Sequence, residues 1–212
     1  GLQGLSTPLV GRQTELARLQ ALVTQAHQTR SAQAITLVGD AGLGKSRLLR
    51  ELVSSVTSEP GCRLLASRSQ PDGLLRPWGL LSDLLAAQFG VADTDSAESA
   101  RRKVEDGLAP WFSERGQAQA QLIGQLSGLD FGHSPHVRGL DPRALRDQAF
   151  AAFRGFLQGL AAQGAAPPLL IVEDLHWADD GSLDLLQHLQ AHAADLPLAV
   201  GPAMSASGGR SA

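Results

Sequence analysis

A glycine-rich stretch at residues 39–46 ends in a lysine and a serine, Lys45 and Ser46. It fits the pattern G-x-x-x-x-G-K-[ST], called Walker A, at every fixed position. In such a stretch, successive backbone N–H groups turn inward around a polyphosphate, and the N-terminus of the following helix adds partial positive charge. We expect Lys45 to reach the β- and γ-phosphates and the Ser46 hydroxyl to ligate Mg²⁺. The backbone expected to cradle the phosphates is that of Gly39, Asp40, Ala41, Gly42, Leu43 and Gly44.

The segments on either side of this loop test whether it is a phosphate site or a glycine-rich turn that ends in Lys-Ser by chance. Residues 34–38 are mostly apolar and predict a buried strand. After the loop, apolar side chains recur at helical spacing over residues 48–56. Strand, glycine loop and helix in this order are the context of a P-loop. The sequence therefore predicts that the chain binds a nucleoside triphosphate.

Two adjacent acids, Glu173 and Asp174, directly follow the apolar run at residues 169–172. This is the Walker B pattern, in which a buried strand carries a carboxylate to the edge of the sheet beside the glycine loop. One carboxylate there holds Mg²⁺ through water, and a second orients or deprotonates the attacking water. We interpret Glu173 as the acid on the metal side and Asp174 as the base, the alternative being two acids that only cap a strand. ATPases usually have Asp before Glu, and the reversed order here favours binding with weak hydrolysis.

Strands and helices alternate along the rest of the chain, which predicts a parallel α/β sheet. Helices are expected at residues 13–28, 80–89, 142–163 and 182–193, and further strands at 62–67 and 196–200. Asp141 and Pro142 are typical of a helix start, with Asp as the N-cap and Pro in the first turn. The segment 90–130 is mostly helical in pattern, and 128–139 is a loop.

These elements predict a three-layer P-loop NTPase core over residues 1–201. Residues 74–140 are too long for one crossover and are expected to form a mostly helical insertion. Residues 202–212 contain only small side chains apart from Pro202, Met204 and Arg210, and are expected to be a disordered tail.

Composition excludes several other classes of protein. The net charge is −3 and no run of Lys or Arg is long enough to suggest an anionic membrane surface, so direct nucleic-acid and membrane binding are not expected. The single cysteine, Cys62, excludes an intramolecular disulfide and is predicted to be buried at a strand start. No apolar run approaches the roughly 20 residues of a membrane span, and a cytoplasmic location is expected. The pairs His133/His136 and His188/His192 have metal-like spacing, but no neighbouring carboxylate or cysteine completes a ligand set.

The residues after the acidic pair resemble those of a known family. Residues 173–186 read EDLHWADDGSLDLL, which is similar to a signature of the AAA-like, signal-transducing (STAND) ATPases, also described as origin-recognition-like AAA. That branch includes the ATPase modules of large LuxR-type transcriptional regulators and of multidomain adenylate and guanylate cyclases. Residues 8–12, PLVGR, look like the entry segment of these modules. Residues 76–81 and 100–108 look closer to the cyclase-linked modules.

The resemblance implies ATP and Mg²⁺ as ligands, with Val10, Gly11 and Arg12 near the adenine. It implies a switch module in a bacterial-type multidomain regulator, whose other domains are its partners. From the residues alone, we interpret His176 as a hydrogen-bonded loop residue and Trp177 as a packing aromatic. The resemblance instead favours a role for both in sensing the γ-phosphate. The family's sensor strand and helical lid are not found in the tail. We therefore expect a C-terminally truncated module that is prone to self-association through an uncovered sheet edge. The alternative is a non-hydrolysing interaction module or a non-functional gene fragment.

Overall fold

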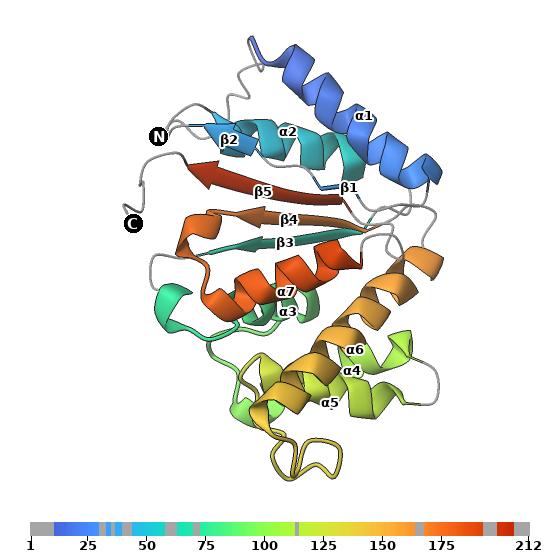
Figure 1. Cartoon of the computed structure of the whole chain (residues 1–212), viewed down its shortest axis with the longest axis vertical. Helices are drawn as coiled ribbons and strands as arrows, with labels where there is room; N and C mark the ends of the chain where they lie inside the picture. Colours follow the sequence, from blue (N-terminus) through green and yellow to red (C-terminus); the bar gives the residue numbers. More distant parts are fainter. Residues whose placement is uncertain are drawn as a thin grey trace.

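The computed structural model of the chain contains a parallel β-sheet with helices on both faces (Figure 1). It describes residues 11–29, 33–34, 37–39, 44–57, 63–69, 73–112, 115–163, 168–192 and 199–205. The helices are α1 (Gln13–Thr29), α2 (Lys45–Thr57), α3 (Gly79–Phe89), α4 (Ala97–Leu108), α5 (Gly116–Leu126), α6 (Pro142–Gln163) and α7 (Asp180–Ala191). Short 3-10 turns are η1 (Gly73–Leu75), η2 (Ala109–Trp111) and η3 (Leu175–Trp177). The strands are β1 (Gln33–Ala34), β2 (Leu37–Gly39), β3 (Leu64–Arg68), β4 (Leu169–Glu173) and β5 (Ala199–Ser205).

All the described strand pairs are parallel, so the carboxyl ends of the strands lie at one edge of the sheet. β3 pairs with β4, β4 pairs with β5, and β5 pairs on its other side with both β1 and β2. At the carboxyl edge, Arg68 lies opposite Glu173, and Gly39 lies opposite Ser205. In open parallel sheets this edge is where ligands bind. The predicted parallel α/β sheet is confirmed.

β5 corrects two expectations from the sequence. The predicted strand at 196–200 is found at Ala199–Ser205, so residues 202–205 belong to the sheet and not to a tail. β5 also lies between β4 and the pair β1 and β2, so the expected uncovered edge at this strand is wrong. The small residues of β5 have low intrinsic strand propensity. They form a strand because its backbone is hydrogen-bonded to strands on both sides. Residues 193–198 and 206–212 lie outside the described part of the chain, as does Cys62.

The side chains of β4 alternate between the two faces of the sheet, and each face has its own apolar cluster. Leu169 and Ile171 pack with buried leucines of α1 and α2. Leu170 and Val172 belong to a larger cluster that includes residues of α3, α4, α5, α6 and α7. α1 and α2 therefore cover one face, while α3 and α7 lie on the other (Figure 1).

Helices α4, α5 and α6 form the helical part of the protein, and they lie where the sequence pattern predicts helices. α4 and α5 pack against each other, and α5 packs against the long helix α6, below the sheet in Figure 1. Asp141 caps α6 as predicted, because its Oδ1 accepts a hydrogen bond from the Ala144 N–H at 2.8 Å. Phe153, Phe156 and Leu157 of α6 are fully buried in the larger cluster.

None of the helices in the described ranges is long and apolar enough to span a membrane. The same residues contain no group of three or more His, Cys, Asp or Glu side chains that is arranged to hold a metal ion. The rings of His188 and His192 lie with their centroids 4.3 Å apart and their planes tilted by 35°.

His188 lies between α6 and α7 in a position that disfavours its protonated form. Its ring is 5.2 Å from that of Phe150, and its buried Nε2 has no hydrogen-bond partner among the described residues. Burial lowers the pKa of His188 below its usual value, and the positive charges of His192 and Arg154 lower it further, against a smaller opposing effect of Asp147. The folded protein therefore takes up a proton at His188 at a lower pH than the unfolded chain does.

We expect acid to destabilise the fold through His188. The unfolded chain binds the proton near pH 6.5, so this contribution to stability is complete above pH 6.5 and is lost as the pH falls towards the folded pKa. Melting temperatures of the wild type and of His188→Gln, measured between about pH 7.5 and pH 5.5, test this: the wild type loses more stability on acidification. His133→Gln, at an exposed loop position, is the control and keeps the wild-type pH dependence. Equal slopes for the wild type and His188→Gln contradict the prediction.

Candidate functional site

The structure brings together the serine of the glycine-rich loop and the first acid after the buried strand. Ser46 is the second residue of α2, and Glu173 is the last residue of β4. The Ser46 Oγ donates a hydrogen bond to Glu173 Oε2 at 3.1 Å, although the two residues are 127 positions apart in sequence. Both side chains are half-buried. A hydroxyl and a carboxylate oxygen at one point fit Mg²⁺, which prefers oxygen ligands and keeps several waters.

A glycine in a left-handed conformation directly precedes α2. Gly44 has φ +78°, a left-handed conformation that a residue with a Cβ adopts only with strain. Its carbonyl accepts hydrogen bonds from the N–H groups of Arg47 and Leu48, at 3.1 and 3.0 Å. Gly39 ends β2 at the carboxyl edge of the sheet. The predicted cradle at residues 40–43 and the side chain of Lys45 lie outside the described residues.

The second acid, Asp174, has a different partner from the first. Its Oδ2 accepts a hydrogen bond from Arg68 Nε at 2.8 Å, and the Arg68 side chain is 59% exposed against 26% for Asp174. The hydrogen bond and charge of Asp174, together with the charge of Glu173, raise the pKa of Arg68. Asp174 has φ 57°, a left-handed conformation that is costly for a residue other than glycine. The neighbouring acids therefore diverge, one towards α2 and the other towards the end of β3.

Arg68 was not identified from the sequence. It is the last residue of β3 and lies opposite Glu173 in the ladder, where the Ser69 N–H also donates to the Glu173 carbonyl at 3.0 Å. The signal was available in principle, because the apolar run at 62–67 was predicted to be a strand of the same parallel sheet. A charged residue directly after that run has to lie at the edge that carries the acids.

The turn η3 follows the acids and contains His176 and Trp177. Their rings are 4.9 Å apart, and η3 packs near β5. The buried Nδ1 of His176 has no hydrogen-bond partner among the described residues, so the interpretation as a hydrogen-bonded loop residue has no support at this atom. A role in sensing phosphate stays a prediction.

The Asp179 side chain binds N–H groups at the starts of two helices, α7 and α3. Asp179 is the N-cap of α7, and its Oδ1 accepts from the Ser182 N–H at 3.0 Å. The same Oδ1 accepts from the Trp78 N–H at 2.9 Å, and Oδ2 accepts from the Gly79 N–H at 3.1 Å. Ser182 Oγ donates to Asp179 Oδ2 and accepts from the Leu80 N–H at 3.1 Å. Asp179 is 8% exposed and Ser182 is 0% exposed, so the first turns of α7 and α3 share one buried polar cluster.

Close packing surrounds this cluster. Trp78, just before α3, has φ 60°, and its ring lies edge-on to Phe150 of α6 with centroids 5.4 Å apart. A Cβ at Gly181 would lie 3.0 Å from the Trp78 ring, so only glycine fits there without a shift. The acidic end of β4 is thus connected through η3 and α7 to α3 and α6. The sequence shows the Asp179-x-x-Ser182 cap of α7, but it carries no local signal for the contact with Trp78, 101 residues away.

The entry segment is only partly within the described residues. Val10 lies outside them, and Gly11 has φ +78° just before α1. Arg12 pairs with Glu15 at 3.5 Å, and its carbonyl accepts from the Leu16 N–H at 3.0 Å. The predicted proximity of Val10, Gly11 and Arg12 to an adenine stays a prediction.

Comparison with known proteins identifies the family. The family described as AAA ATPase domain matches residues 8–200. An uncharacterized protein of Rhizobium meliloti (strain 1021) is 30% identical over 195 residues, which are 90% of this chain but 18% of that protein's length. The chain therefore corresponds to a small part of this relative. Because the family match covers nearly the whole chain and includes the loop and the acidic strand, the chain belongs to the AAA ATPase domain family of nucleotide-binding P-loop NTPases.

Proposed function

We propose that this chain is an ATP·Mg²⁺-dependent switch module, with a three-layer core, in a multidomain signalling or transcriptional regulator. The observation that carries the proposal is the 3.1 Å hydrogen bond between Ser46 and Glu173. It joins the hydroxyl expected to ligate Mg²⁺ to the carboxylate expected on the metal side. The left-handed Gly44 and the start of α2 at Lys45 support the same assignment.

Each residue at the carboxyl edge has a proposed role. Backbone N–H groups of residues 39–44 hold the phosphates, and Lys45 neutralises their charge. Ser46 and Glu173 hold Mg²⁺, which supplies charge neutralisation on the β- and γ-phosphates when bound. Asp174 accepts the proton of the attacking water through Oδ1, because Oδ2 is held by Arg68. Arg68 is a positioning residue, since it contacts Asp174 and acts through it.

A second candidate function is a nucleotide-binding interaction module that does not hydrolyse ATP. The Arg68–Asp174 ion pair favours it, because it turns the candidate base towards β3 in the described structure. The parent context is inferred from the signature at residues 173–186 and from a relative much longer than this chain. In both functions, the other domains of the proposed multidomain regulator receive the signal.

We expect Lys45→Ala to weaken ATP binding by about ten- to a hundredfold, because it removes charge-assisted contacts to phosphate. Titration of the wild type and the variant with a fluorescent ATP analogue in the presence of Mg²⁺ measures the effect. Lys103→Ala is the matched control: this lysine bonds Asp95 and the Gly90 carbonyl in the helical part, so its loss leaves ATP affinity unchanged. Equal affinities for Lys45→Ala and the wild type remove the P-loop assignment.

A further inference from the structure

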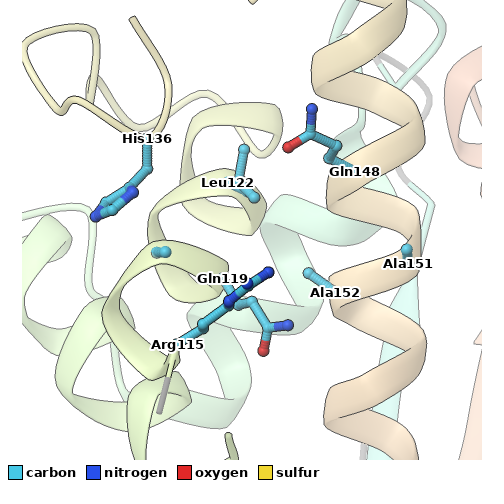
Figure 2. Close-up of a pocket in the computed structure, with 8 residues that line it drawn as sticks. Arg115, Gln119, Leu122, His136, Gln148, Ala151 and Ala152 are labelled. Atoms are coloured by element: carbon cyan, nitrogen blue, oxygen red, sulfur yellow. The ribbon is translucent and has the colours of Figure 1, made fainter.

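A pocket of about 430 Å³ lies in the helical part of the protein, between α5, α6 and the loop that precedes α6 (Figure 2). No residue of the nucleotide site described above lines it. Its walls consist of Arg115, Ala118, Gln119, Leu122, His136, Gln148, Ala151 and Ala152. Its volume is within the range of small-molecule sites, roughly 300–1,000 Å³.

The polar side chains that line this pocket include one guanidinium and several hydrogen-bond donors. Arg115, His136 and the two glutamines supply hydrogen-bond donors, and no carboxylate is among the lining residues of the described chain. Figure 2 shows the Arg115 guanidinium extending from the start of α5 into the space beside Ala152. No hydrogen bond or ion pair links this guanidinium to another described residue. A guanidinium binds a carboxylate bidentately, so one monoanion satisfies it.

The rest of the lining is apolar. Ala118 of α5 and Ala151 and Ala152 of α6 contribute methyl side chains to it. The side chain of Leu122, 7% exposed, adds an apolar wall near the first turns of α5. A small apolar body with a charged end at Arg115 can contact these side chains, and His136 approaches from the loop that precedes α6 (Figure 2).

We propose that the pocket between α5 and α6 is a binding site for a small organic carboxylate with an apolar body. Arg115 binds the carboxylate, Gln119 and Gln148 donate to its oxygens or to a polar substituent, and the alanines and Leu122 contact the apolar part. The site is separate from the nucleotide site and does not depend on the function proposed for it.

Benzoate is the probe, and ligand-observed NMR titration of the full chain measures its binding. Benzamide, which has the same shape without the charge, and inorganic phosphate, which has the oxygens without the apolar body, are the comparison probes. The variants are Arg115→Gln, and Ala151→Leu, which fills the pocket from an exposed position of α6. Arg138→Gln is the matched control, because Arg138 is exposed on the same loop as His136 but does not line the pocket.

For the wild type we expect saturable benzoate binding with a dissociation constant on the order of millimolar, as befits a ligand of this size. Arg115→Gln weakens it about tenfold or more, Ala151→Leu abolishes it, and Arg138→Gln leaves it unchanged. Melting curves show that the variants are folded. The proposal is overturned if benzoate does not saturate, if Arg115→Gln binds it like the wild type, or if benzamide or phosphate binds as tightly as benzoate.

Discussion

Replacement of Asp179 by alanine is expected to lower the free energy of unfolding by about 3–5 kcal/mol. The carboxylate accepts hydrogen bonds from the N–H groups of Trp78, Gly79 and Ser182 and from the Ser182 hydroxyl. Alanine leaves these donors without acceptors in a region where Asp179 is only 8% exposed. At about 2–4 °C per kcal/mol for a domain of this size, the melting temperature falls by roughly 10 °C.

Asp180→Ala is the control for this experiment. Asp180 is the next residue along the chain and is exposed at the first position of α7, so its loss removes only a favourable charge at a helix N-terminus, about 1 kcal/mol or less. Asp179→Asn keeps one acceptor oxygen, and its melting temperature is expected to lie between those of Asp179→Ala and Asp180→Ala. A melting temperature for Asp179→Ala as high as that of Asp180→Ala contradicts the shared-cap interpretation.

The second large effect concerns turnover. Asp174→Asn keeps the size of the side chain but cannot accept the proton of the attacking water, so phosphate release is expected to fall by about a hundredfold or more. ATP affinity is expected to stay within about threefold, because the groups proposed to bind the phosphates and Mg²⁺ are other residues. Single-turnover phosphate release and titration with the fluorescent ATP analogue measure the two quantities separately.

Two other outcomes of this experiment have different meanings, and a control variant accompanies them. If Glu173→Gln abolishes release while Asp174→Asn does not, the roles of the two acids are reversed. If the wild type binds ATP but releases no phosphate in a single turnover, the non-hydrolysing interaction module is the correct function. Asp180→Asn, an identical chemical change at a neighbouring exposed acid, is expected to release phosphate like the wild type.

Features of the fold that depend on short stretches of sequence are predictable from them. The cap at Asp141 and the helices α1, α3 and α6 follow from residue types within one or two helical turns. The meeting of Ser46 and Glu173 is also predictable, because a motif that ends one strand and an acid that ends another share the edge of a parallel sheet.

The remaining features depend on contacts between distant segments. The Arg68–Asp174 pair needs the order of β3 and β4 in the sheet, and the Asp179–Trp78 contact needs the packing of α3 on α7. Neither contact can be predicted from the spacing of apolar residues along the sequence. β5 was misjudged for the same reason, because the small residues at 199–205 have a weak strand pattern and the hydrogen bonds that hold them come from β4, β1 and β2.

The position of β5 also sets the order in which the protein can assemble during synthesis. The strand that precedes the glycine-rich loop, β2, pairs with β5, and in the part of the chain that the structure describes β5 is the last strand to be made. α4, α5 and α6 are contiguous and can pack on one another while the ribosome is still translating. β1 and β2, by contrast, have to wait until residues 199–205 have left the ribosome before they find their described partner in the sheet. β1 and β2 are therefore expected to join the described sheet only after β5 has been made, whereas β3 and β4 can pair with each other earlier.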